Sequence, residues 1–162
     1  MVGDLIAGTR LWELFESLAF TKGSKLYHVF YFRISVSHLI LALSKYCELY
    51  KRFKSVIPKS VLSKAKSLSA QINDKGIISF RNKVIGHIWD DDLNRPLTSE
   101  ETDQRLGAIL APDPTAFLKW INNHKNGNIA GSVVATCESI KEAIKAEYKL
   151  SETEIFDAED KK

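Results

Sequence analysis

The longest periodic stretch of the chain is KLYHVFYFRISVSHLILALSKYCELYKRF, residues 25–53. Its apolar side chains recur at the three- and four-residue spacings that place them on one side of an α-helix. These apolar residues are Leu26, Val29, Phe30, Ile34, Leu41, Tyr46 and Leu49. The pattern predicts a helix that is buried over a wide face. We therefore expect residues 25–53 to form the central helix of the core.

Helical patterns also occur on both sides of this segment. They cover residues 4–21, 61–72, 99–110, 116–122 and 129–150. Thr98, followed three residues later by Glu101, fits a capping box, while Asp113 and Pro114 suit the cap and first turn of another helix. Residues 90–96 read as a polar loop, and no stretch predicts a sheet. The sequence therefore predicts an all-α fold, a bundle of about five to seven helices.

The length and composition are typical of one globular domain with a sizeable core. The chain has 162 residues, of which 44% are hydrophobic and 27% are charged. We expect a helical domain over residues 1–150 and a short charged tail over residues 151–162. No apolar run reaches the length of about 18 residues that a membrane span needs. The sequence therefore predicts no contact with a membrane.

The N-terminus and the cysteines favour a cytoplasmic protein. Asp4 lies near the start of the chain, which lacks the basic-then-apolar order of a signal peptide. Cys47 and Cys137 lie in helical stretches and do not have the spacing of a metal site. We therefore expect a reduced, cytoplasmic chain.

Positive charge is concentrated between Ser44 and Val84. This interval holds ten Lys and Arg residues against two acids, Glu48 and Asp74, for a net charge of +8, whereas the whole chain carries +3. A segment with this charge can hold a polyanion such as RNA. The same charge is equally typical of a solvated, lysine-rich helix surface.

The residues best suited to chemistry lie in FRNKVIGHIWD, residues 80–90. They are Arg81, Asn82, Lys83, His87 and Asp90. On an ideal helix Lys83 and His87 share a face, because they are four positions apart. Arg81 and His87 are six positions apart, about 240° around the helix, and do not share a face. A bend at Gly86, or a second copy of the chain, would bring this Arg and His together.

This stretch resembles the signature of the HEPN family, small all-helical domains named for higher-eukaryote and prokaryote nucleotide binding. The signature is an Arg, four to six residues of any kind, and a His, often with a polar residue directly after the Arg. Here Arg81 and Asn82 are followed by four further residues and His87. An acid soon after the His, here Asp90, recurs in branches with an RNK-like core.

The resemblance implies a HEPN-type bundle and a metal-independent endoribonuclease that needs no cofactor. It implies that Arg81 holds the scissile phosphate and that His87 is the acid or base, at a cleft between the subunits of a homodimer. Asn82 would orient either group or bind phosphate, and Lys83 would be a second phosphate contact. Asp90 would fix the imidazole tautomer, cap a helix or pair with Lys83. Toxin–antitoxin or phage-defence systems, with a nucleotidyltransferase-like inhibitory partner, are the implied setting.

The residue types suit RNA cleavage by the RNA's own 2′-hydroxyl. A histidine can accept or donate a proton near neutral pH. A permanently charged guanidinium can stabilise the negative charge that develops on the phosphate oxygens. A single Arg–His pair is a sparse site, so two pairs across a twofold axis would make a denser one.

Other interpretations remain open at this stage. The chain would otherwise be a non-catalytic helical HEPN module that binds a nucleotide or a partner protein. In a purely structural interpretation, Arg81 and Asp90 form a surface ion pair and His87 is a polar helix end. A weaker alternative is a metal-dependent phosphohydrolase built on residues 90–92, since hard cations prefer oxygen ligands. Arg33 and His38 also satisfy the loose Arg-to-His spacing. They are expected to be structural, or at most to line the same cleft.

Overall fold

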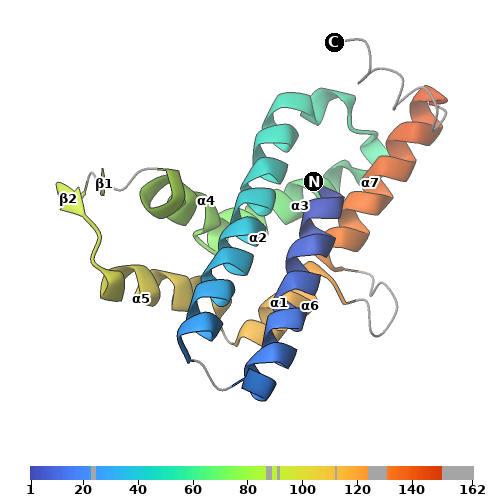
Figure 1. Ribbon diagram of the computed structural model, residues 1–162. Coiled ribbons are helices and arrows are strands. Elements are labelled where there is room, and N and C mark those ends of the chain that lie inside the picture. Colours follow the sequence, from blue (N-terminus) through green and yellow to red (C-terminus); the bar gives the residue numbers. More distant parts are fainter. Residues whose placement is uncertain (23–24, 87–88, 91, 112, 124–130, 151–162) are drawn as a thin grey trace, which may run out of the picture.

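The computed structural model describes residues 1–22, 25–86, 89–90, 92–111, 113–123 and 131–150. Within these residues the fold is all-α, as the sequence predicts (Figure 1). The α-helices are α1 (Val2–Lys22), α2 (Lys25–Phe53), α3 (Lys59–Asp74), α4 (Ile77–Phe80), α5 (Ser99–Leu110), α6 (Pro114–Ile121) and α7 (Val133–Tyr148). A 3-10 turn, η1 (Lys54–Val56), follows α2, and a π-helix, η2 (Arg81–Gly86), follows α4.

The helices α1 and α2 form an antiparallel pair at the centre of the fold, and α7 packs against α1 while α3 packs against α2 (Figure 1). Trp12 of α1 meets Phe32 of α2 edge to face, with ring centroids 4.8 Å apart. The buried apolar residues of α2 are Val36, Leu39, Ile40, Ala42, Leu43, Tyr46 and Cys47. They belong to one cluster that also receives buried side chains from α1, α3, α4, α5, α6 and α7. α2 therefore has both the bounds and the central place that the sequence predicts.

Two apolar residues of α2 do not lie where the periodicity places them. Ile34 and Leu41 are 44% and 43% exposed, although both were expected on the buried face. They are seven residues apart and so lie on one line of the helix, away from the line of Val36 and Leu43. The stretch is apolar around most of its circumference, which is why its pattern alone does not select the buried side. The side chains of residues 26, 29 and 30 lie outside the described part of the structure.

Local capping signals give accurate helix starts. Thr98 Oγ1 accepts a hydrogen bond from Glu101 N at 3.2 Å, and Thr98 N donates to Glu101 Oε2 at 2.8 Å, so the capping box of α5 is complete. Asp113 accepts from Ala116 N at 2.8 Å and caps α6 as predicted. α7 begins later than predicted, because Ser132 caps it by accepting from Ala135 N. The predicted residues 129 and 130 lie outside the described residues.

The polar loop predicted at residues 90–96 contains a short antiparallel pair of strands that the sequence does not predict. Strands β1 (Trp89–Asp90) and β2 (Arg95–Pro96) are antiparallel, with Asp90 opposite Arg95. Asp90 Oδ1 accepts from Asp92 N at 2.9 Å and Leu93 N at 3.2 Å, which closes the turn. Strands of two residues are too short to produce an alternating pattern, so periodicity could not reveal them.

The carboxylate of Glu101 ties this hairpin to α5. Arg95 Nη1 and Nη2 lie 2.9 Å and 2.7 Å from its two oxygens. The Arg95 hydrogen bonds, followed by the Thr98 N–H, lower the pKa of Glu101 to about 2. In Figure 1 the hairpin and α5 lie on the side of α2 away from α1 and α7.

No helix in the described part of the chain has both the length and the apolar character needed to cross a membrane.

Gly8 allows α1 to approach α2 closely. A Cβ atom at this position would lie 2.6 Å from Leu39 Cδ2 and 3.1 Å from His38 Cδ2. Leu39 is fully buried, so its side chain has little room to move away. By contrast, a Cβ at Gly107, on the exposed side of α5, would meet no atom within 4 Å.

We predict that Gly8→Ala destabilises the protein by roughly 1–3 kcal/mol, because the added methyl group overpacks the α1–α2 contact. The matched variant Gly107→Ala should stabilise it by about 0.5–1 kcal/mol, since alanine favours a helix and nothing obstructs it. Urea unfolding monitored by circular dichroism measures both values. A Gly8→Ala protein as stable as Gly107→Ala would show that α1 and α2 do not depend on this approach.

Candidate active site

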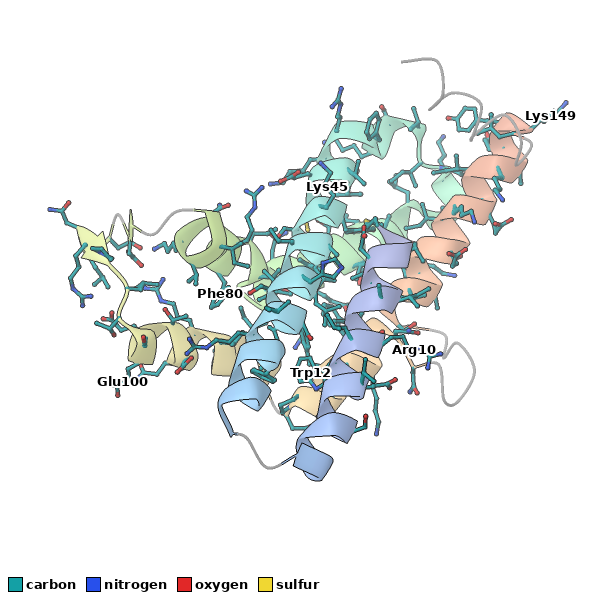
Figure 2. The ribbon with its side chains drawn as sticks, in the orientation of Figure 1. Arg10, Trp12, Lys45, Phe80, Glu100 and Lys149 are labelled. Atoms are coloured by element: carbon teal, nitrogen blue, oxygen red, sulfur yellow. The ribbon has the colours of Figure 1, made fainter. Side chains whose placement is uncertain are left out.

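The motif begins on α4 and continues into η2. Gly76, with a φ of 72°, adopts the left-handed conformation that favours glycine and precedes α4. Ile77 and Phe80 are buried and hold α4 in the core, with Phe80 beside α2 (Figure 2). From Arg81 to Gly86 the backbone is π-helical, with hydrogen bonds between residues five apart. Such segments are rare in proteins and are often found at functional sites.

Arg81 points from η2 toward α2. Its Nη2 lies 3.1 Å from Glu48 Oε1, and its Nη1 donates to Asn82 Oδ1 at 3.0 Å. The Arg81 side chain is 39% exposed, so solvent reaches the guanidinium despite both contacts. Asn82 thus contacts the guanidinium, and its orienting role stays a prediction. Glu48 is a partner that the sequence does not reveal, because it is 33 positions away.

Lys83 and Asp90 meet in a separate cluster that includes α5. Lys83 Nζ lies 3.4 Å from Asp90 Oδ1 and also contacts Asp92. Arg105 of α5 lies 2.7 Å from Asp90 Oδ2, and the Asp90 side chain is fully buried. Of the roles considered for Asp90, pairing with Lys83 is therefore present, whereas pairing with Arg81 is not. Nothing in the sequence pattern points to Arg105.

The environment of Asp90 favours its charged form. Burial by itself raises the pKa of this carboxyl group. The opposing hydrogen bonds from Leu93 N, Arg105 and Asp92 N, together with the charge of Lys83, are stronger in sum and lower the pKa below its usual value of 3.8. The carboxylate thus joins η2, the hairpin and α5 as a buried anion.

His87 lies outside the described residues, as do Ile88 and Asp91. Its predicted meeting with Arg81, and the predicted effect of Asp90 on its tautomer, therefore stay predictions. The structure does describe the chain up to Gly86, directly before the histidine. Because that chain is π-helical, the ideal α-helical spacing assumed for Lys83 and His87 does not apply to it.

A polar pocket of about 380 Å³ lies between α1, α2 and η2. Its lining includes the charged or polar side chains of Asp4, His38, Ser44, Lys45, Glu48 and Arg81. The pocket lies beside the predicted Arg and draws its other polar groups from residues far away in the sequence. Among the motif residues that the structure describes, Arg81 lines it.

The second Arg–His pair of the sequence is divided between two places. Arg33 Nη2 pairs with Asp103 Oδ1 of α5 at 2.8 Å. His38 instead lines the polar pocket, with Nε2 at 3.1 Å from the Asp4 carbonyl oxygen. His38 thus shares a cleft with Arg81, whereas Arg33 has a structural contact. The loose Arg-to-His spacing to Arg33 is the sequence signal that marks this histidine.

Several lysines of the basic interval are exposed, including Lys51, Lys54, Lys59, Lys64 and Lys66. They lie on the end of α2, on η1 and on α3. In the described part of the chain, no group of three or more His, Cys, Asp or Glu side chains is placed to hold a metal ion. In the acidic run, Asp90 is buried against two cations and Asp92 contacts Lys83, while Asp91 is outside the described residues.

No protein-family model, curated protein or solved structure matches this chain. The resemblance to the HEPN family therefore rests on the motif of residues 81–87 and on an all-α fold that is compatible with it.

We predict that Asp90→Asn lowers the urea midpoint of unfolding most at neutral pH. A carboxyl group with a lowered folded pKa stabilises the fold fully above its unfolded pKa, near 3.8, and loses that effect as the pH falls toward the folded value. The difference between wild type and Asp90→Asn should therefore shrink progressively as the pH falls below 3.8. Urea unfolding of both proteins, measured at neutral pH and below pH 3.8, tests the direction of this pH dependence.

Asp92→Asn is the matched control, because Asp92 also contacts Lys83 but is 79% exposed. It should change the midpoint little, since exposed ion pairs contribute little to stability. If Asp90→Asn and Asp92→Asn have the same effect, Asp90 does not anchor this region.

Proposed function

We propose that this protein is a metal-independent endoribonuclease of HEPN type that cleaves RNA by attack of the 2′-hydroxyl. Arg81 and His87 are the reacting-site residues, at the cleft of a homodimer. The observation that carries the proposal is the position of Arg81: a partly exposed guanidinium, oriented by Asn82, beside a polar pocket. It lies in a π-helical segment that runs to the residue before His87.

The reaction needs one proton acceptor, one proton donor and a stabiliser of negative charge. The 2′-oxygen loses its proton to a base and bonds to the adjacent phosphorus, and the P–O5′ bond breaks as an acid protonates the leaving O5′. The products are a 2′,3′-cyclic phosphate and a 5′-hydroxyl, so no water, metal or oxidant is consumed. His87 supplies proton transfer near neutral pH. Arg81 stabilises the charge on the nonbridging oxygens.

A homodimer supplies what one subunit lacks. Each chain contributes one Arg81 and one His87, so a twofold axis through the cleft provides both an acid and a base. Leu41, 43% exposed, lines the same pocket as Arg81 and gives a second subunit an apolar surface beside the site. Ile34, 44% exposed on the same line of α2, extends that surface. We also propose a toxin–antitoxin or phage-defence setting, with a nucleotidyltransferase-like inhibitor. This part of the proposal rests only on the resemblance of the motif to the HEPN signature.

A second candidate, a non-catalytic module that binds a nucleotide or a partner protein, is favoured by a different observation. Glu48 neutralises the charge of Arg81, and the carboxylates of Asp90 and Asp92 hold Lys83. The cations of the motif would then serve mainly to hold η2 in place. The solvent exposure of the Arg81 guanidinium argues for the endoribonuclease.

We expect the purified protein to cleave single-stranded RNA in the presence of EDTA. Arg81→Ala and His87→Ala should each lose at least about 100-fold in rate, because each removes a group that acts in the transition state. Lys54→Ala, an exposed cation of η1, is the control and should retain most of the activity. Gel-resolved cleavage, with circular dichroism and native mass for every variant, measures this.

The results separate the three interpretations. A folded wild-type dimer that cleaves none of several RNAs would favour the binding module. Activity that requires a divalent metal would overturn the proposed mechanism and direct attention to residues 90–92. Loss of activity in Lys54→Ala equal to that in Arg81→Ala would indicate a general charge effect instead of a site.

A further inference from the structure

Two cations from different elements converge on one carboxylate in the polar pocket. Lys45 Nζ of α2 lies 3.4 Å from Glu48 Oε2, and Arg81 Nη2 of η2 lies 3.1 Å from Glu48 Oε1. Each oxygen of Glu48 therefore faces a different positive charge. Lys45 is 60% exposed and Glu48 47% exposed, so solvent reaches both side chains. An anion that enters from solvent can compete with Glu48 for both cations.

Ser44 adds a polar group without a partner to the lining of this pocket. Its side chain is 2% exposed, and its Oγ makes no hydrogen bond within the described structure. Helix serines and threonines commonly bond to a carbonyl one turn back, as Thr9 does to Ile6 O at 2.9 Å and Ser17 to Leu14 O at 2.6 Å. A buried hydroxyl without a partner is unfavourable for folding. Its presence here points to a ligand that satisfies it.

The pocket has the chemistry of a phosphate site. A phosphodiester has two nonbridging oxygens that share one negative charge and can replace the two oxygens of Glu48, and these oxygens can also accept a hydrogen bond from Ser44. Of the two acids in the lining, Asp4 and Glu48, it is Glu48 whose oxygens face Lys45 and Arg81. Glu48 is therefore the carboxylate that opposes an entering phosphate.

We propose that the RNA phosphate held by Arg81 is also held by Lys45 and Ser44, and that Glu48 is an internal counter-ion which this phosphate displaces. The inference rests on the proposed function, because it uses the same Arg81. It adds Lys45 and Ser44 as phosphate-binding residues and Glu48 as a displaceable counter-ion. In the free protein Glu48 keeps the guanidinium and the ammonium near each other without a ligand, and RNA binding exchanges one anion for another.

The test measures the binding of a fluorescent 2′-O-methyl RNA oligonucleotide by anisotropy over a series of salt concentrations. This probe has the phosphates of RNA but no free 2′-hydroxyl, so it cannot be cleaved. Glu48→Gln should bind about 2–5-fold more tightly than wild type, the range expected for losing a competing exposed ion pair. Lys45→Ala should bind more weakly, with the slope of log K against log salt reduced by about one.

Matched variants separate the pocket from general charge. Asp74→Asn removes the other acid of the basic interval, and Lys51→Ala removes another exposed lysine of α2. Asp74→Asn should change the affinity less than Glu48→Gln does, and Lys51→Ala less than Lys45→Ala does. In an Arg81→Ala background the gain from Glu48→Gln should become smaller, because the two residues act on each other.

Ser44→Ala tests the buried hydroxyl separately. It should weaken binding by roughly 2–5-fold while leaving Tm at or above the wild-type value, because the hydroxyl has no partner in the free protein. A purely structural Ser44 would lower Tm on substitution without a specific loss of affinity. Tm and RNA affinity are both measured on the same preparations of wild type and Ser44→Ala.

The inference is overturned if Glu48→Gln gains no more than Asp74→Asn, or if Lys45→Ala loses no more than Lys51→Ala. Absence of binding by both the wild type and Glu48→Gln at low salt overturns it as well. Because the probe cannot be cleaved, these outcomes do not depend on catalysis. Cleavage that needs Arg81 and His87 without these binding effects would retain the proposed function and reject only the role of Glu48.

Discussion

The close approach of α1 and α2 at Gly8 is the contact on which the candidate site depends. There is no room for a Cβ between this position and the buried Leu39, so the two backbones meet more closely than larger residues would allow. The approach places Asp4 of α1 beside His38 of α2. Glu48, the residue of α2 that pairs with Arg81, lies farther along the same helix. A packing constraint in the core thus positions one wall of a polar pocket.

A buried anion provides the other fixed point. Asp90 receives Lys83 from η2, Arg105 from α5 and backbone N–H groups from its own turn. Buried charges are tolerated when they are paired and hydrogen-bonded, and their loss leaves an uncompensated partner. The motif is therefore divided into an inner half that holds the segment in place and an outer half, Arg81 and Asn82, that faces solvent and α2. This division separates the residues that hold the segment in place from those that are exposed for the proposed binding of RNA.

Local signals predicted the helices well, because the interactions that begin a helix lie within one turn of the chain. Thr98 and Glu101 satisfy each other, and Asp113 caps α6, with no help from distant residues. Periodicity was less reliable where α2 is apolar on several sides, so the exposure of Ile34 and Leu41 was missed. The hairpin and η2 were missed because two-residue strands and a π-helical register leave no periodic trace.

The sequence by itself determined the all-α fold, most helix bounds and the clustering of Arg81, Asn82, Lys83, His87 and Asp90 in one segment. Each of these depends on residue type and on spacing along the chain. Only the tertiary structure decided the partners: Glu48 for Arg81, Arg105 for Asp90, and a shared pocket for His38 and Arg81. These contacts join residues on different elements, and ion pairing depends on distance in space, which folding sets by burying the apolar faces of helices.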